Sequence, residues 1–169
     1  IDDWEIDPGE VTSWHPTAAA LEAARQAPVS SVPVTYMQSQ HLRGYYERTA
    51  AGLDYSRLLV TACELPGRCD IDVMSYALNA YLRRHDTYRS WFERTGPGDI
   101  VRHIIDDPAD IEFAPTKHGE LTVEKLYEHV VSTPDPLRWG CFSFGIVQGE
   151  DHFTFYASID HVHGDASLI

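Results

Sequence analysis

The chain has 169 residues, 43% of them hydrophobic and 23% charged, which is the composition of a folded globular domain. Its formal net charge of -13 excludes nucleic acid as an expected partner, because phosphate binding needs clustered cations. Its apolar runs are far shorter than the roughly 20 residues that span a bilayer, so we expect at most peripheral contact with a membrane.

The cysteines and the two ends of the chain set further limits. Cys63, Cys69 and Cys141 are an odd number in no metal-ligand or redox spacing, so we expect them to pack as small hydrophobic residues in a reducing cytoplasm. Because the first residue is not methionine and residues 167–169 resemble the opening of a helix, we expect a fragment of a longer protein.

The first segment is expected to be peripheral. Residues 1–30 are acidic and then Ala-rich, and Pro28 follows a run of good helix formers over 17–26. We therefore expect an arm with one short helix over 1–30, followed by a single lobe over 31–169.

Strands and helices follow in the middle of the chain. The aliphatic and β-branched run 57–65 ends at a Pro-Gly turn and predicts a strand. Asp72 is expected to cap a helix whose apolar face continues to Leu82. A second strand is expected over 100–105 and a second helix over 122–131.

A β-hairpin near the end of the chain has the clearest pattern. Residues 142–146 and 153–159 alternate apolar with small or polar side chains around the turn 149–151. The polar segment 161–165 follows the second strand directly. A mixture of strands and helices without strict βαβ alternation favours an α+β fold built in layers.

His161 is the first candidate for chemistry. A histidine in a loop at the end of a strand has a backbone held by a rigid scaffold and a ring whose ordinary pKa suits proton transfer. Asp165, four residues later, is placed to orient the ring or to anchor the loop. His103 and Asp107 have the same spacing but begin inside an apolar strand pattern without a glycine, so we interpret them as a chance match.

Three motifs in order resemble those of one group of enzymes. The segments 34–42 (VTYMQSQHL), 82–92 (LRRHDTYRSWF) and 159–166 (IDHVHGDA) are similar to the pMQ, RHexLRt.F and HHxxxDG motifs of the condensation-domain superfamily of acyltransferases. The resemblance covers roughly residues 31–169. With its acidic arm and Trp14, the chain looks most like the mycobacterial polyketide-associated acyltransferases.

This resemblance implies a fold and an activity. Family members have two chloramphenicol acetyltransferase-like lobes, each a two-layer α/β sandwich, and this chain is expected to be the N-terminal lobe, ending just after the HxxxD motif. The expected enzyme is an O-acyltransferase that moves a long-chain fatty or polyketide acyl group to a trehalose-type sugar or glycolipid precursor. Its donor is expected to be acyl-coenzyme A or an acyl-carrier protein, with a polyketide synthase as a further partner, in the cytoplasm or at the inner face of the membrane.

The resemblance also assigns roles residue by residue. His161 matches the catalytic histidine, the expected general base, and Asp165 matches the aspartate, which is expected to orient the loop. No covalent enzyme intermediate, cofactor or metal is implied, and no cofactor-binding residue is identified. Asp160 stands where amino-acid condensation domains have a first histidine, which disfavours peptide-bond formation, and Ala166 replaces the final glycine, which leaves the loop geometry open.

Other interpretations stay open at this stage. A condensation domain that joins carrier-protein thioesters and a non-catalytic docking module of the same fold are the alternatives. A metal site built from His161, His163 and Asp165 is also conceivable, but the sequence pattern supplies no further cluster of His and Cys to complete it.

Overall fold

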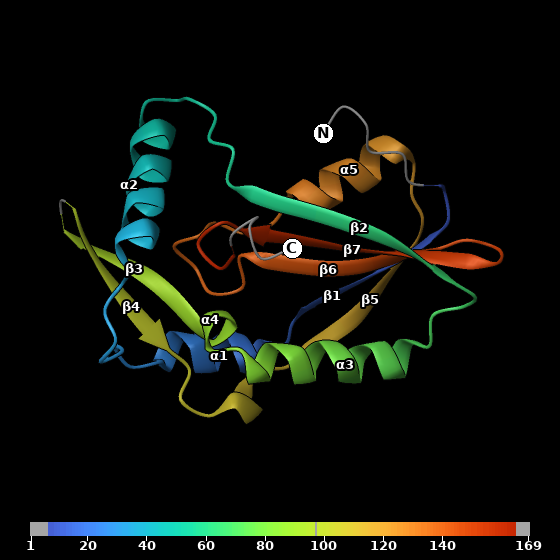
Figure 1. The fold of residues 1–169 in the computed structure, drawn as a ribbon, viewed down its shortest axis with the longest axis horizontal. Helices are drawn as coiled ribbons and strands as arrows, with labels where there is room; N and C mark the ends of the chain where they lie inside the picture. Colours follow the sequence, from blue (N-terminus) through green and yellow to red (C-terminus); the bar gives the residue numbers. More distant parts are fainter. Residues whose placement is uncertain (1–6, 97, 165–169) are drawn as a thin grey trace.

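A five-stranded antiparallel sheet forms the centre of the protein. The computed structural model describes residues 7–96 and 98–164. The strand order of this sheet is β2-β7-β6-β1-β5, and a separate two-stranded sheet pairs β3 with β4 (Figure 1). The strands are β1 (Glu10–Pro16), β2 (Leu58–Pro66), β3 (Ser90–Gly96), β4 (Asp99–Ile104), β5 (Phe113–Glu120), β6 (Phe142–Gln148) and β7 (His152–Asp160). The helices are α1 (Ala18–Gln26), α2 (Tyr36–Ala50), α3 (Ile71–Arg84), α4 (Asp86–Arg89), the 3-10 turn η1 (Pro108–Asp110) and α5 (Val123–Val131).

Helices cover both faces of the large sheet. Because side chains alternate along a strand, Trp14 of β1 points toward α1 and α3, while Val11 points toward α5. Trp14 Nε1 donates a 2.7 Å hydrogen bond to Ser75 Oγ on α3. On the other face, Val11 packs in one cluster with Leu126 and Val130 of α5. The α+β fold expected from the sequence is confirmed, with α5 on the face opposite α1 and α3.

The position of β1 corrects one expectation. Glu10–Pro16 lies between β6 and β5, with Val11 and Trp14 buried, so the expectation of a peripheral arm is wrong for this strand. The helix expected after it is confirmed as α1, and its Ala20 and Ala24 belong to the main core. The partners of β1 are more than 90 residues away in the sequence, so its local pattern carries little information about its place. The division of the chain at residue 30 stays a prediction.

The other predicted elements are present, with small shifts at their ends. The strand expected over 57–65 is β2, and the hairpin is formed by β6 and β7. The expectation that Asp72 caps the next helix is wrong. Asp72 lies in the first turn of α3, and the cap is Asp70, whose carboxylate accepts hydrogen bonds from the N–H groups of Asp72 and Val73.

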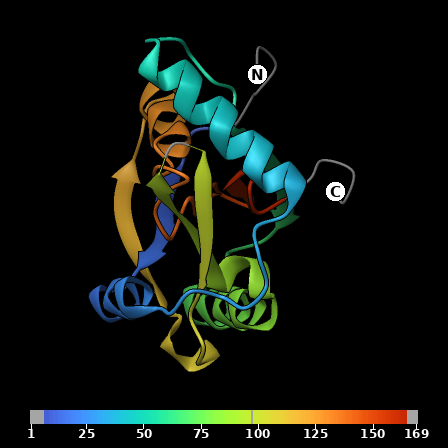
Figure 2. The same ribbon diagram turned by 90° about the vertical axis from the view of Figure 1, so that its left-hand side faces the viewer.

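Helix α2 is not predicted by the sequence pattern. Its first turn is closed by a reciprocal capping box between Thr35 and Gln38. Leu42 is its one buried residue among those described, so no apolar stripe marks the helix. Leu42 packs in a small cluster with Phe92, Cys141 and Val162. Through this cluster α2, which lies across the β3–β4 hairpin in Figure 2, contacts the loop that follows β7.

Cys141 and Cys63 differ in their burial. Cys141 is buried, as expected, and burial is the main reason that the pKa of its thiol is raised. The expectation is wrong for Cys63, which is exposed because β2 lies at the edge of the sheet.

Across residues 7–96 and 98–164, no helix combines the length and the apolar character that crossing a membrane requires.

Candidate active site

His161 lies in a turn directly after β7. Its side chain is exposed, whereas Asp160 before it and Val162 after it are buried. The His161 N–H donates to the Arg57 carbonyl at 2.9 Å, and the His163 N–H donates to the Asp160 carbonyl at 2.9 Å. The fold therefore presents one exposed imidazole on a backbone that is held on both sides.

The carboxylate of Asp160 is the centre of this arrangement. It is fully buried and accepts three hydrogen bonds, from His41 Nε2 (2.7 Å), the Val162 N–H (3.0 Å) and Arg57 Nη1 (2.9 Å). Arg57 also donates to the carbonyls of Thr133 and Pro134. Burial alone would raise the pKa of Asp160, but the donors from His41, Val162 and Arg57 outweigh it, and the pKa is lowered. The loop backbone is thus bound to a buried carboxylate that is charged near pH 7.

His41 connects α2 to the same centre. Because the carboxylate of Asp160 only accepts hydrogen bonds, the Nε2 atom of His41 carries a hydrogen. The Nδ1 atom of His41 then faces the Tyr55 hydroxyl at 3.3 Å. The centroids of the His41 and His161 rings are 5.9 Å apart. His41 therefore lies against His161 while it is hydrogen-bonded on both of its own nitrogens.

His163 points into the protein. Its ring packs against Phe142 and Tyr88, with centroids 5.3 and 6.1 Å away. Burial is the main cause that lowers the pKa of His163 to about 4, so the ring is neutral near pH 7. Its Nδ1 atom lies 3.4 Å from Thr87 Oγ1, and in the described part of the chain its Nε2 atom has no hydrogen-bond partner.

A cavity of about 540 Å³ begins beside this loop. His163 and Gly164 of the loop line one part of it, and the rest lies between α3 and the sheet. Its lining is mostly apolar and aromatic and consists of Leu59, Thr61, Leu78, Tyr81, His85, Thr87, Tyr88, Phe144, Phe155, Ala157 and Ile159. Such a cavity suits an aliphatic chain rather than a charged group.

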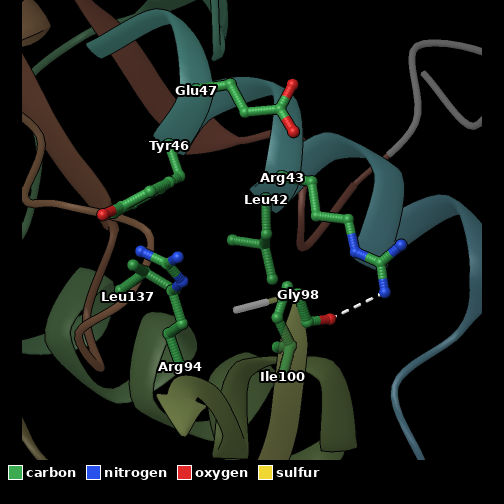
Figure 3. Close-up of a pocket in the computed structure, with 8 residues that line it drawn as sticks. All are labelled: Leu42, Arg43, Tyr46, Glu47, Arg94, Gly98, Ile100 and Leu137. Atoms are coloured by element: carbon green, nitrogen blue, oxygen red, sulfur yellow. Dashed lines mark hydrogen bonds between the residues drawn. The ribbon is translucent and has the colours of Figure 1, made fainter. Parts of the chain in front are cut away.

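A second cavity, of about 320 Å³, lies between α2 and the β3–β4 hairpin (Figure 3). Both arginines that line it, Arg43 and Arg94, interact with other residues of the cavity wall. Arg43 donates to the Gly98 carbonyl at 2.7 Å, and the Arg94 guanidinium lies 3.5 Å from the centroid of the Tyr46 ring. These contacts join α2 to the hairpin and hold Leu42, whose cluster contains Val162 of the loop.

The remaining sequence candidates have other positions. Asp165 lies outside the described residues. His103 is buried, stacks on Trp91 with centroids 4.2 Å apart and contacts the Ala27 carbonyl, while the carboxylate of Asp107 caps η1. The second HxxxD spacing is therefore used for packing and capping.

Two residues of the site were missed from the sequence. His41 falls in the segment 34–42, whose resemblance to a family motif is the one signal that could have marked it. Arg57 carries no such signal, because its role depends on a carboxylate that lies 103 positions away in the chain.

Comparison with known proteins identifies relatives of the whole chain. The sequence matches no family model. Acyltransferase PapA3 of Mycobacterium tuberculosis is 61% identical over 169 residues, which are 100% of this chain and 36% of that protein. The 2'-acyl-2-O-sulfo-trehalose (hydroxy)phthioceranyltransferase PapA1 of Mycobacterium bovis is 55% identical over 100% of this chain and 33% of its own length. The chain is a homologue of the mycobacterial PapA acyltransferases.

A solved structure of a homologue agrees with the fold. The PapA2 acyl transferase superposes with a TM-score of 0.93 at 53% identity, over 99% of this chain and 36% of that one. The chain thus has the fold of one lobe of a chloramphenicol acetyltransferase-like enzyme, as expected from the sequence. It spans about a third of the length of the PapA relatives that it matches.

Proposed function

We propose that the protein containing this chain is an O-acyltransferase that moves a long-chain acyl group from a thioester to a hydroxyl of a trehalose-type glycolipid precursor. The observation that carries the proposal is the exposed ring of His161, held on a loop whose backbone is bound to the buried charge of Asp160. Homology to PapA acyltransferases along the whole chain supports the reaction class, and the name of PapA1 supports a trehalose-type acceptor.

His161 acts as the general base in the proposed step. The neutral ring takes the proton of the acceptor hydroxyl as the hydroxyl oxygen attacks the thioester carbonyl carbon. The tetrahedral intermediate then expels the sulfur, and the protonated ring returns the proton to it. One C–O bond forms and one C–S bond breaks, giving an ester and a thiol. The step needs no cofactor, metal or covalent enzyme intermediate.

Other residues of the chain have supporting roles in this proposal. We assign positioning roles to Asp160, Arg57 and His41. Asp160 is bound by Arg57 and His41, and the His41 ring packs against the His161 ring. We assign to Asp165 the orientation of the loop. The acyl chain occupies the apolar cavity between α3 and the sheet, because that cavity is lined by His163 and Gly164 of the His161 loop and by aliphatic and aromatic side chains.

The proposed donor is acyl-coenzyme A or an acyl-carrier protein of a polyketide synthase, used in the cytoplasm or at the inner face of the membrane. The test uses the protein at its natural length, with palmitoyl-coenzyme A or a palmitoyl-carrier protein as donor. Trehalose and its 2-sulfate are the acceptors, and ester formation is measured.

Three proteins are compared: the wild type, His161→Ala and, as a control that also loses one histidine, His152→Ala. We expect His161→Ala to lower turnover by about 10²- to 10⁴-fold with an unchanged circular dichroism spectrum, and His152→Ala to leave it within a few fold. Turnover that survives in His161→Ala would contradict the general-base role. A wild type that transfers from neither donor to either acceptor would contradict the proposed reaction.

A further inference from the structure

Three histidines from separate elements lie together on the face of the sheet that α5 covers. His15 belongs to β1, His118 to β5 and His129 to the last turn of α5. One side-chain nitrogen of each lies within 4.8 Å of one nitrogen of each of the others. We propose that this three-histidine cluster binds a divalent transition-metal ion, with Zn²⁺ as the best match to imidazole ligands.

The backbone of β5 aims His118 into the cluster. In the β1–β5 ladder Val11 pairs with Gly119 and Thr12 pairs with Lys117, so His118 is the extra residue of a β-bulge. Gly119 has a φ of +70°, a left-handed conformation that glycine adopts at little cost. Thr116 pairs with Ser13, so the alternation of β5 already places His118 on the face that carries Ser13 and His15, and the bulge at residues 118 and 119 sets the backbone from which its ring projects.

A buried hydroxyl orients two of the rings. Ser13 is fully buried, and its Oγ lies 2.6 Å from His15 Nε2 and 2.7 Å from His118 Nε2. A hydroxyl oxygen has two lone pairs, so it can accept from the Nε2–H of both rings, which leaves the lone pair on the Nδ1 atom of each ring for a metal ion. Hydrogen bonds of this kind fix the orientation of metal-binding imidazoles in known sites.

The three rings are suited to bind a cation. Burial, followed by the neighbouring His118, lowers the pKa of His15, and burial followed by His118 and His15 lowers the pKa of His129. In the described part of the chain no carboxylate forms an ion pair with any of the three. Neutral imidazoles close together offer lone pairs that a metal ion can use, whereas protonated ones would repel one another.

The spacing is compatible with a bound ion after small side-chain movements. Tetrahedral Zn²⁺ with Zn–N bonds of about 2.0–2.1 Å brings its nitrogen ligands to roughly 3.4 Å from one another. The centroids of the His118 and His129 rings are already 4.6 Å apart, and those of His15 and His129 are 5.9 Å apart. Those of His15 and His118 are 6.3 Å apart, so metal binding requires these half-buried side chains to rotate toward one another. The cluster is on the opposite face of the sheet from the apolar cavity, so its role is separate from binding the acyl chain.

The test measures metal binding by the protein at its natural length. The protein is stripped with a chelator, and Zn²⁺ is titrated against a competing chelator, with Co²⁺ absorption as a report on ligand geometry. We expect the wild type to bind a Zn²⁺ ion that raises its Tm, and His15→Ala, His118→Ala and His129→Ala each to weaken binding more than about 100-fold. Because truncation can also disturb folding, His118→Gln is measured in parallel and must keep the circular dichroism spectrum of the wild type.

His152→Ala is the matched control. His152 lies 2.9, 3.7 and 3.9 Å from the carboxylates of Asp151, Asp7 and Glu64, so a cation could also gather near this histidine. This variant is expected to keep the wild-type Zn²⁺ affinity. A wild type without Zn²⁺ affinity, binding that survives replacement of all three cluster histidines, or binding lost only in His152→Ala would overturn the proposal.

Discussion

The His161 loop and the three-histidine cluster hold their imidazoles by different physical means. Around His161, a buried carboxylate fixes the backbone through charged donors, and the ring itself is exposed. In the cluster, the paired backbones of β1 and β5, with the bulge at residues 118 and 119, and a neutral hydroxyl set the directions of half-buried rings. Loss of a charge near the loop should therefore lower the stability of the protein. A change in backbone conformation near the cluster should lower its affinity for Zn²⁺.

The largest expected effect comes from removing the charge under the loop. In Asp160→Asn, Arg57 stays in place with its side chain 15% exposed and loses its anionic partner. An uncompensated buried charge costs about 3–5 kcal/mol in the free energy of unfolding, which urea denaturation measures. Glu22→Gln is the control, because Glu22 pairs with Arg25 at 2.6 Å while their side chains are 51% and 67% exposed, and we expect less than about 1 kcal/mol there. Equal losses in the two variants would show that the buried pair does not hold the loop.

The same variant has a defined pH dependence. The pKa of Asp160 in the folded protein lies below its ordinary value, so the folded state keeps this charge to lower pH than the unfolded chain does. Its contribution to stability is complete above about pH 4 and is lost as the pH falls through the folded pKa. The difference in stability between wild type and Asp160→Asn should shrink in that range.

The lowered pKa of His163 should make stability depend on pH at higher pH values than Asp160 does. Its pKa falls from 6.5 to about 4 on folding, chiefly through burial, while Asp160 opposes and Arg102 adds to the shift. The unfolded chain therefore binds more protons between these values, and stability should fall by about 3 kcal/mol as the pH is lowered from 6.5 to 4. His163→Phe should remove this part of the slope, and His85→Phe, at an exposed position, should keep it. An unchanged slope in His163→Phe would mean that the ring is not buried as a neutral base.

Short-range patterns predicted those parts of the fold that rest on local chemistry. Thr122 caps α5 as expected, and the alternation of Phe142, Phe144 and Ile146 identifies β6 because one residue in two faces the main core. Helix α2 was missed because Leu42 is its one buried side chain among those described, so packing against distant residues replaces an apolar stripe. Strand β1 was missed because its partners come from distant parts of the chain.

The same distinction applies to the two sites. His161 and its neighbours are contiguous in sequence, so a motif marks them. The hydrogen bond from His41 to Asp160 joins residues 119 positions apart, and His15 meets His118 only because β1 and β5 pair. The expectation that no metal is needed came from the motif alone. It remains a prediction for the catalytic step and does not extend to a cluster that only the tertiary fold assembles.

A smaller effect is expected from narrowing the cavity beside the loop. Leu59 is half-buried on the edge strand β2, and its Cδ1 atom lies close to Gly164. Leu59→Trp should lower kcat/KM for a palmitoyl thioester about tenfold more than for an acetyl thioester, because the longer chain needs the filled space. Val60→Trp, on the opposite face of the same strand, is the control and should not distinguish the two donors. Equal losses for both donors in Leu59→Trp would place the acyl chain elsewhere.

The smallest effect is expected from changing the backbone conformation at Gly119, next to the three-histidine cluster. Gly119→Ala puts a side chain on a residue with a φ of +70° in open space, so the substitution changes only the cost of the left-handed conformation, about 1 kcal/mol. Gly52→Ala is closely matched, with a φ of +69° and no neighbouring atoms within 4 Å, and should lose the same stability. Relief of strain at residue 119 shifts the bulge and with it His118, so Gly119→Ala should weaken Zn²⁺ binding while Gly52→Ala does not. Equal Zn²⁺ affinities in the two variants would show that the bulge does not direct His118 to the metal.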